Sequence, residues 1–366
     1  MLNKKTIAVI IPIYNGDEFI DKLYNSIPDF VDRIIFVNNN STDNSLKLLL
    51  KYVEENKGKG IEIKEIKYKI TRNLYNNAEI IQIQQSEIEK KYLSYTENLE
   101  INTDLDKVIL LNFTKNLGVG SAIINGYKWA KDRNIDCIVT LDDKSILSQD
   151  DFLSICKPII DNNVDYVKGS RVIHSSSLLI YPRLKYLVFS ILSALTKLAS
   201  GYWQLSDSQS VVTAISLNAL KGLKIFRLSK NSGFFNDILV RLNIAMCSIR
   251  EVPIKQIMLS QEFLQKQKFD GFTQNIILLI NLFFKRLYFK YLFRDFHPLF
   301  LLYHLSFIIF ILSIPLSIEI ILRLFIEGSI ITDIVLLVYL FLIITSYQSL
   351  LFAMWMDMQD NERLNK

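Results

Sequence analysis

Polar side chains follow three apolar runs in the first half of the chain, at the point where each run stops. The runs and the polar residues that follow them are 7–13 with Tyr14 and Asn15, 34–37 with Asn38 and Asn39, and 137–141 with Asp142 and Asp143. Side-chain amides can pair with the edge of a nucleobase, and carboxylate oxygens suit hard cations such as Mg²⁺ or Mn²⁺. Buried strands that each deliver polar residues at their carboxyl ends describe an open α/β sheet with a ligand crevice at that edge.

The segments that connect these runs have the spacing of helices. Residues 18–30 carry apolar side chains on one helical face, and Ser41 and Thr42 predict the N-cap of a second helix. Strand and helix therefore alternate, as a parallel βαβ layout requires.

A polar segment, residues 56–106, interrupts this alternation. It is rich in Lys, Glu, Asn and Gln, and we expect an inserted, exposed hairpin or helical arm with no assigned function, with a binding element as the alternative. The core resumes at 108–111. The glycines Gly118 and Gly120 then predict a tight turn that opens a helix ending near Lys131.

The C-terminal part of the chain is far more apolar. Two stretches, about 298–318 and 334–356, have no formal charge and are long enough to cross a hydrocarbon core about 30 Å thick. The segment 272–293 before them is predicted to be an interfacial helix with basic residues facing anionic headgroups. These basic residues are Lys285, Arg286 and Lys290. A shorter apolar stretch, 185–202, is expected to pack on the domain or to lie at the membrane surface.

Composition narrows the classes of function. The chain has 366 residues, half of them hydrophobic, which is too long and too apolar for one ordinary soluble domain. The net charge of +5 is not gathered into a tail or block suited to nucleic acid, so a nucleic-acid-binding function is disfavoured. The 3 cysteines are widely spaced and flanked by apolar residues, which indicates buried free thiols in a reducing compartment.

Several short segments occur in a defined order along the chain: 11–15, 38–43, 116–120, 141–143, 169–171, 207–210, 235–239 and 251–254. In this order and spacing they resemble the motifs of the family 2 glycosyltransferases, and more narrowly those of membrane-anchored polyprenyl-phosphate glycosyltransferases related to dolichyl-phosphate mannose synthase. The resemblance covers about residues 5–270 apart from the inserted segment. It implies the GT-A fold, a Rossmann-like α/β architecture with a mostly parallel sheet.

The resemblance implies a nucleotide diphosphate sugar as donor, with a uridine diphosphate sugar favoured. The family has acidic residues where this chain has Asn38 and Asn39, so the preferred base stays open, and an Asx turn is the alternative function of these amides. Gly118 and Gly120 either let the backbone approach the nucleotide or form only a tight turn. The predicted donor-binding residues are Pro12, Tyr14, Asn15, Asn38, Asn39, Asn116, Gly118, Gly120 and Asp142.

An Asp-x-Asp motif in this family holds a divalent cation, Mg²⁺ or Mn²⁺, that neutralises the leaving diphosphate. The matching triplet here is Asp142, Asp143 and Lys144, so lysine replaces the second acidic ligand. Three interpretations follow. Asp142 and Asp143 hold the metal in a shifted geometry, or Lys144 itself screens the diphosphate as a fixed cation, or activity is lost.

The resemblance also implies a site for the acceptor. Arg171 matches the family's arginine near the acceptor phosphate, with a surface salt bridge as the alternative, and a guanidinium fits phosphate geometry well. Asp237 either orients a substrate or is a carboxylate favoured at a helix start. Asp207 and Gln209 line the sugar pocket or brace the acceptor loop. The predicted acceptor-binding residues are Arg171, Ser170, Asp207 and Gln209. The predicted catalytic residues are Asp142, Asp143, Lys144, Arg171 and Asp237.

We therefore expect an inverting glycosyltransferase that moves a hexose to a polyprenyl phosphate, undecaprenyl or dolichyl, at the cytoplasmic membrane face. Two alternatives stay open: an enzyme whose acceptor is a glycolipid or lipid hydroxyl, and a catalytically silent membrane scaffold. We expect a GT-A domain at 1–270, a juxtamembrane amphipathic segment at 271–296 and two spans within 297–366. The catalytic domain and both termini are expected to be cytoplasmic. The oligomeric state is left open, a homo-oligomer included.

Overall fold

The computed structural model describes most of the chain, in the ranges 2–63, 73, 75–93, 103, 105–143, 145–171, 183–231, 233–255, 257–258, 272–325 and 332–366. Lys144, the third residue of the predicted metal triplet, lies outside the described residues.

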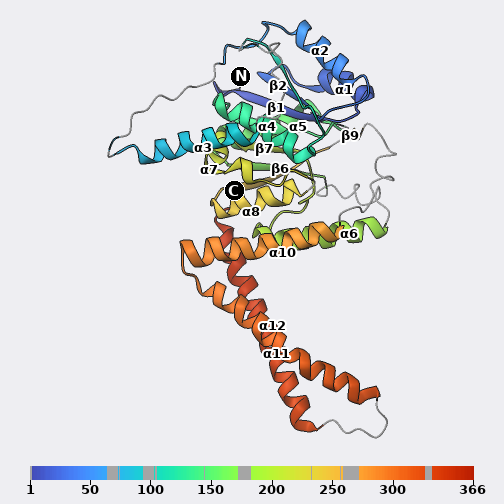
Figure 1. Ribbon diagram of the computed structural model, residues 1–366, viewed down its shortest axis with the longest axis vertical. Coiled ribbons are helices and arrows are strands. Elements are labelled where there is room, and N and C mark those ends of the chain that lie inside the picture. The colour runs from blue at the N-terminus through green and yellow to red at the C-terminus, as the bar shows by residue number, and fades with distance from the viewer. Residues whose placement is uncertain are drawn as a thin grey trace.

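Apolar strands form the centre of the part of the molecule that precedes the C-terminal helices (Figure 1). The strands are β1 (Ile7–Ile13), β2 (Arg33–Asn38), β3 (Val108–Asn112), β4 (Cys137–Thr140), β5 (Ser145–Ile146), β6 (Tyr166–Ser170), β7 (Thr213–Ser216), β8 (Ile249–Pro253) and β9 (Ile257–Met258). Within the described residues, seven of them form one sheet in the order β3-β2-β1-β4-β7-β6-β8, and β5 pairs with β9. β7 is antiparallel to both of its neighbours, and the other pairs in the seven-stranded sheet are parallel. The predicted α/β class with a mostly parallel sheet is confirmed.

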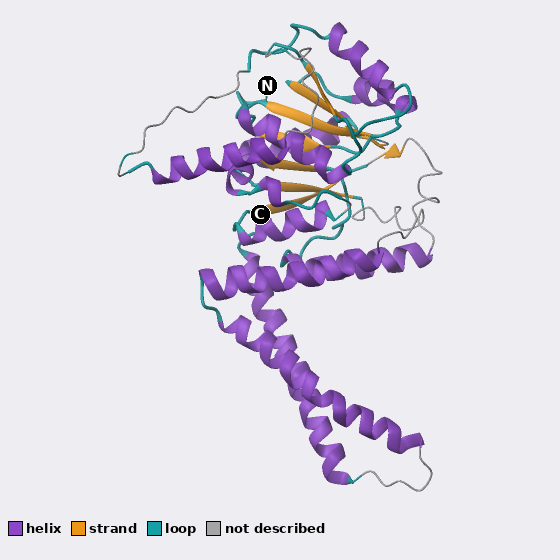
Figure 2. Ribbon diagram, in the orientation of Figure 1, coloured by secondary structure: helices purple, strands orange, loops and turns teal. Residues whose placement is uncertain are grey.

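Helices cover both faces of this sheet (Figure 2). The helices before residue 245 are α1 (Asp17–Ser26), α2 (Ser45–Glu55), α3 (Asn77–Leu93), α4 (Val119–Asp132), α5 (Gln149–Asn162), α6 (Arg183–Ser200), α7 (Leu217–Gly222) and α8 (Phe234–Ile244), with a 3-10 turn at Ile225–Arg227. Residues of α4, α7 and α8 share one apolar core with the sheet, and residues of α1, α2 and α5 share the other. Because both faces are covered, every residue of β1 is buried.

One predicted helix start was wrong. The second helix begins at Ser45 with Asn44 as its N-cap, not at Ser41 or Thr42. Ser41 and Thr42 do not cap the helix because they bind Asn15 instead. The Asn15 backbone N–H donates to Ser41 Oγ at 3.1 Å, and the Thr42 backbone N–H donates to Asn15 Oδ1 at 2.9 Å. They hold the β1 and β2 loops together.

The inserted segment contains a helical arm, α3, that crosses the outside of the sheet domain (Figure 1). The arm is attached through a buried carboxylate. Glu89 has no exposed side-chain surface, and its oxygens lie 3.0 and 3.1 Å from the Lys131 ammonium on α4. On the outer side Ile81 and Ile88 are exposed.

The C-terminal region is helical. It contains α10 (Phe272–Tyr288), a π-helical turn (Phe289–Arg294), α11 (Pro298–Phe325) and α12 (Asp333–Glu362). Within the described residues, two helices are long and apolar enough to cross a membrane: Pro298–Arg323 with a mean hydropathy of 2.5, and Asp333–Glu362 with 2.2. Only 11% of each apolar window is buried, whereas a core helix of a soluble domain would be mostly buried. α11 and α12 pack together as a hairpin that projects away from the sheet domain (Figure 1).

Two basic residues predicted to face headgroups are buried instead. Arg286 has no exposed side-chain surface and its Nη1 lies 2.8 Å from Asp357 Oδ1, and Lys290 Nζ lies 3.1 Å from Asp360 Oδ2. The prediction failed because the end of α12 returns to the sheet domain and brings Asp357 against α10 and Asp360 against the π-helical turn that follows α10. We call Arg286, Lys290, Tyr291, Asp357, Asp360 and Asn361 the junction cluster.

Candidate active site

Four of the predicted site residues follow strands that end at one edge of the sheet. β1, β2, β3 and β4 are mutually parallel, and β6 runs in the same direction because both β4 and β6 are antiparallel to β7. The edge therefore receives Asn15 after β1, Asn39 after β2, Asp142 after β4 and Arg171 after β6. This is the edge at which open α/β sheets bind ligands.

The asparagines at this edge bind one another. Asn38 Nδ2 donates to Asn112 Oδ1 at 2.6 Å, and Asn38 Oδ1 accepts from the Ser41 amide nitrogen at 3.2 Å. Asn39 Nδ2 donates to Asn116 Oδ1 at 2.9 Å. Asn38 is only 1% exposed. These contacts favour the turn-shaping alternative for Asn38 over pairing with a base.

Two other predicted donor residues differ in accessibility. Pro12 is buried within β1 and supports the edge from inside the sheet. Tyr14, two residues further on, is 46% exposed. The side chain of Tyr14 is therefore accessible to a ligand, whereas that of Pro12 is not.

Gly118 and Gly120 let the protein's own backbone approach. A Cβ atom at Gly118, where φ is +88°, would lie 2.6 Å from the Lys230 carbonyl oxygen, and one at Gly120 would lie 2.4 Å from the Ser229 carbonyl oxygen. The Ser121 amide nitrogen donates to Lys230 at 3.0 Å. The two glycines thus seat the 229–230 loop on the start of α4, a contact between distant segments that the sequence pattern did not reveal.

Asp142 and Asp143 follow β4 and are both half-buried. A Cβ atom at Gly16 would lie 3.7 Å from Asp143 Oδ2, so the ends of β1 and β4 meet here. Among the described residues there is no group of three His, Cys, Asp or Glu side chains that could hold a metal. The edge thus offers two adjacent carboxylates.

Arg171 and Asp207 form a two-pronged ion pair. Arg171 Nε lies 2.7 Å from Asp207 Oδ2, and Nη2 lies 3.1 Å from Oδ1. The Asp207 side chain is 5% exposed and the Arg171 side chain 23% exposed. Burial alone would raise the pKa of Asp207, but the charge and hydrogen bonds of Arg171 outweigh it and hold this pKa below its usual value. The guanidinium is therefore fixed in one orientation with part of its surface open.

The remaining predicted residues are engaged within the protein. Asp237, in the first turn of α8, is 3% exposed and accepts from the Ser229 amide nitrogen at 2.9 Å and from Arg241 Nε at 2.8 Å. Gln209 Nε2 donates to Ser208 Oγ at 3.0 Å. Ser170 Oγ is buried and has no hydrogen-bond partner in the part of the chain that the structure describes. The contacts of Asp237 match its interpretation as a helix-start carboxylate.

Lys168 is a residue of this region that was not predicted from the sequence. It lies within β6, has no exposed surface, and donates from Nζ to the Ser210 carbonyl oxygen at 2.9 Å. Burial lowers its pKa to about 8, an effect that Asp207 partly opposes. A signal was present, because a lysine inside the short run Tyr166–Ser170 is the one charged residue of a buried strand.

Comparison with known proteins gives a family match and two curated relatives. The family model described as "Glycosyl transferase family 2" matches residues 8–70 and 63–223, which together cover more than half of the chain. A UDP-N-acetylglucosamine--dolichyl-phosphate N-acetylglucosaminyltransferase of Methanococcus voltae is 29% identical over 254 residues, covering 69% of this chain and 86% of that protein. An uncharacterised protein of Methanocaldococcus jannaschii is 28% identical over 150 residues, covering 41% of this chain and 61% of that protein.

Solved structures resemble the chain more distantly. Glucosyl-3-phosphoglycerate synthase of Mycobacterium tuberculosis, in complex with Mn²⁺, UDP and glucosyl-3-phosphoglycerate, aligns with a TM-score of 0.45 and 14% identity, over 77% of this chain and 80% of that one. The same enzyme with Mg²⁺ and UDP aligns with a TM-score of 0.45 and 15% identity, over 77% of this chain and 79% of that one.

Proposed function

Since this chain belongs to glycosyl transferase family 2 and is a glycosyltransferase, we propose that it moves a hexose from a nucleotide diphosphate sugar to a polyprenyl phosphate at the cytoplasmic membrane face, with inversion. One observation carries the proposal. The consecutive aspartates Asp142 and Asp143 and the oriented guanidinium of Arg171 lie at one sheet edge, in a chain that continues into an exposed apolar hairpin. The name of the Methanococcus voltae relative supports both the acceptor class and a uridine diphosphate donor.

The hairpin α11–α12 would anchor the enzyme in the membrane where the acceptor lies. The chain leads away from the sheet domain through α11 and returns to it at the end of α12. The Ile249 amide nitrogen on β8 donates to the Leu364 carbonyl oxygen at 2.7 Å, and the Lys366 amide nitrogen donates to the Ile249 carbonyl oxygen at 3.1 Å. These bonds support a topology in which the C-terminus lies on the same side as the catalytic domain. Confining enzyme and acceptor to one surface brings the reactants together.

The acceptor chemistry makes modest demands on the protein. A phosphate monoester is already anionic near neutral pH, so its oxygen can attack the sugar without a strong general base. Asp207 binds Nε and Nη2 of Arg171, so the phosphate would be bound at the Nη1 side of the guanidinium, whose charge and N–H donors suit phosphate oxygens. Asp237 is engaged by Ser229 and Arg241, which fits an acceptor that needs no base from this position. Direct attack on the anomeric carbon, without a covalent enzyme intermediate, gives inversion.

A divalent cation fits the donors present. Mg²⁺ is usually bound by one or two carboxylates together with substrate phosphates, so Asp142 and Asp143 need no third protein ligand. These two residues would hold the ion. When bound, it would neutralise charge on the leaving diphosphate.

Transfer of labelled sugar to polyprenyl phosphate tests the proposal. Full-length protein in detergent is given a panel of nucleotide sugars, UDP-N-acetylglucosamine first, with EDTA or with added Mn²⁺. We expect product that EDTA abolishes and Mn²⁺ restores. Because a bound cation supplies several kcal/mol, Asp142→Asn should lower turnover by about 100-fold or more, while Asp150→Asn, an exposed carboxylate on α5, should not.

Other outcomes point to the alternatives. Product that survives EDTA would favour Lys144 as the cation that screens the diphosphate. Transfer only to a lipid hydroxyl would require a working base, and Asp237→Asn should then abolish it. Folded protein that shows no thermal shift with any nucleotide would indicate a silent scaffold.

A further inference from the structure

Glu251 lies on the strand beside the one that ends in Arg171. β8 is parallel to β6, with Glu251 opposite Lys168 and Pro253 opposite Ser170. The strand pairing therefore keeps Glu251 at a constant distance from the end of β6. Glu251 is not one of the residues proposed above to bind the donor, the metal or the acceptor.

The Glu251 carboxylate binds the backbone of the loop that carries Asp207. The Ser206 amide nitrogen donates to Glu251 Oε2 at 2.8 Å and to Oε1 at 3.0 Å, and the Asp207 amide nitrogen donates to Oε1 at 2.9 Å. Two successive amide groups on one carboxylate fix the position and the direction of this piece of backbone. Hydrogen bonds to an ionised acceptor are about twice as strong as neutral ones.

Asp207 in turn orients Arg171. Its carboxylate accepts from Arg171 Nε and Nη2, and also from the Arg171 amide nitrogen at 3.3 Å. The contacts form a closed ring that runs from β6 through Arg171, Asp207 and Glu251 to β8. The two carboxylates of the ring are offset by two cations, Arg171 and the buried Lys168.

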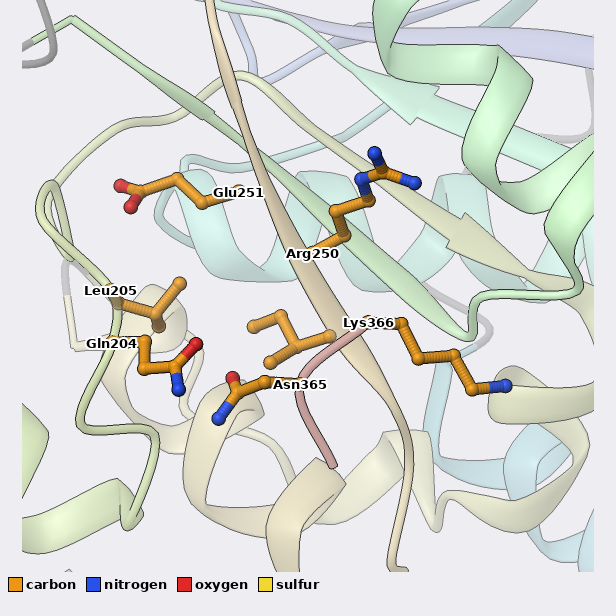
Figure 3. Close-up of a pocket in the computed structure, with 7 residues that line it drawn as sticks. Gln204, Leu205, Arg250, Glu251, Asn365 and Lys366 are labelled. Atoms are coloured by element: carbon orange, nitrogen blue, oxygen red, sulfur yellow. The ribbon is translucent and has the colours of Figure 1, made fainter. Parts of the chain in front are cut away.

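The loop that carries Ser206 and Asp207 is not packed against protein on every side. A cavity of about 170 Å³ lies between the loop, β8 and the C-terminal tail, and it is lined by Gln204, Leu205, Ile249, Arg250, Glu251, Asn365 and Lys366. Figure 3 shows Glu251 and Arg250 leaving β8 in opposite directions. Because there is free space beside the loop, weakening the bonds to Glu251 lets the loop move without a steric clash.

We propose that Glu251 is a positioning residue for sugar transfer: it holds the 206–207 backbone so that Asp207 aims the Arg171 guanidinium at the phosphate of the acceptor. This inference rests on the proposed function in one respect, the assignment of the acceptor phosphate to Arg171. It predicts that disturbing Glu251 weakens the use of the acceptor and leaves the use of the donor unchanged.

The test compares Glu251→Gln with Arg250→Gln, a matched change at the next residue of the same strand, which is exposed. Glutamine loses the charge and presents an NH₂ group to one of the amide donors. We expect Glu251→Gln to raise the KM for polyprenyl phosphate about tenfold, as the loss of a charged hydrogen bond predicts, with the KM for the nucleotide sugar within about twofold of wild type. Arg250→Gln should change neither. If Glu251→Gln lowers the melting temperature, Glu251→Asp, which keeps the charge, is measured beside it and should recover part of the acceptor KM.

Coupling to Arg171 is measured in a double-mutant cycle. If Glu251 acts through the guanidinium, Glu251→Gln adds no further increase in acceptor KM once Arg171→Ala is present. A second measurement needs no turnover: labelling of Arg171 by phenylglyoxal, followed by mass spectrometry, should be several times faster in Glu251→Gln than in wild type or Arg250→Gln.

Equal increases in both KM values, full additivity with Arg171→Ala, or unchanged labelling of Arg171 would each overturn the positioning role. Wild-type protein that transfers no sugar to polyprenyl phosphate would instead overturn the proposed function. The labelling experiment then decides by itself whether Glu251 positions Arg171.

Discussion

Replacing Asp357 by asparagine should be one of the most destabilising single changes in this protein. Arg286 and Asp357 have no exposed side-chain surface, and Arg286 Nη1 and Nη2 each lie 2.8 Å from an Asp357 oxygen. Tyr291 Oη donates to the same carboxylate at 2.7 Å, and Trp203 Nε1 donates at 3.1 Å. Asparagine keeps the shape of the side chain but leaves the buried guanidinium without its counter-charge.

The size of the effect follows from this burial. Removing one partner of a buried ion pair costs about 3–5 kcal/mol, because the other charge is left uncompensated. At about 2 °C or more per kcal/mol, the melting temperature should fall by at least about 6 °C. The double replacement Arg286→Met with Asp357→Leu removes both charges, and we expect it to recover much of the loss.

The assay is thermal unfolding of full-length protein in one detergent, followed by intrinsic fluorescence. The control is Asp333→Asn, the same change at the exposed start of the same helix. If Asp357→Asn and Asp333→Asn have the same melting temperature, the junction cluster does not join the α11–α12 hairpin to the sheet domain, and its proposed stabilising role is wrong. A double replacement less stable than Asp357→Asn would contradict the argument from an uncompensated charge.

Three further changes test the packing and charges of the sheet domain. Gly120→Ala places a methyl group 2.4 Å from the Ser229 carbonyl oxygen and should cost about 1–3 kcal/mol, whereas Gly222→Ala meets no atom within 4 Å and should leave the melting temperature unchanged; equal effects would contradict the close approach. Burial lowers the pKa of Lys168 from 10.5 to about 8, so the charged lysine opposes folding. Lys168→Met should raise the free energy of unfolding by about 2 kcal/mol at pH 7, and this gain should shrink above pH 8. A gain that grows above pH 8 would refute the prediction. Burial would raise the pKa of Asp207, but Arg171 holds this pKa low, so the ion pair stabilises the fold until the pH falls through the lowered pKa. Asp207→Asn should therefore reduce the loss of stability at acid pH. An unchanged loss at acid pH would contradict a stabilising ion pair.

Much of the fold could be predicted because local patterns determine it. The apolar runs at 7–13, 34–37 and 137–141 became β1, β2 and β4, since a strand buried on both faces has few other ways to satisfy its backbone. The GT-A assignment and the family are confirmed by the sheet and the family match. The two charge-free stretches became α11 and α12, because a mostly apolar stretch of about twenty residues without a charge is typical of a membrane-length helix.

The candidate site could be predicted only in part. Asp142 was expected at a strand end, whereas Arg171 was predicted only through the family resemblance; the sheet brings both residues to one edge. The ion pair between Arg171 and Asp207 could not be predicted, and Asp207 was expected to line the sugar pocket or brace the acceptor loop. The roles of Glu251 and Lys168 could not be predicted either, because they depend on which strand lies beside β6.

The sequence by itself determined the elements, the edge at which polar residues gather, and the two membrane-length helices, because these depend on the order of apolar and polar residues over short distances. Only the tertiary structure decided how charges are used. Arg286 was expected at the membrane surface and is instead paired with Asp357, 71 residues away. Arg171 finds Asp207 36 residues away. A charged side chain has no local signature that distinguishes a solvated residue from a paired one, so burial and the distant partner decide its state together.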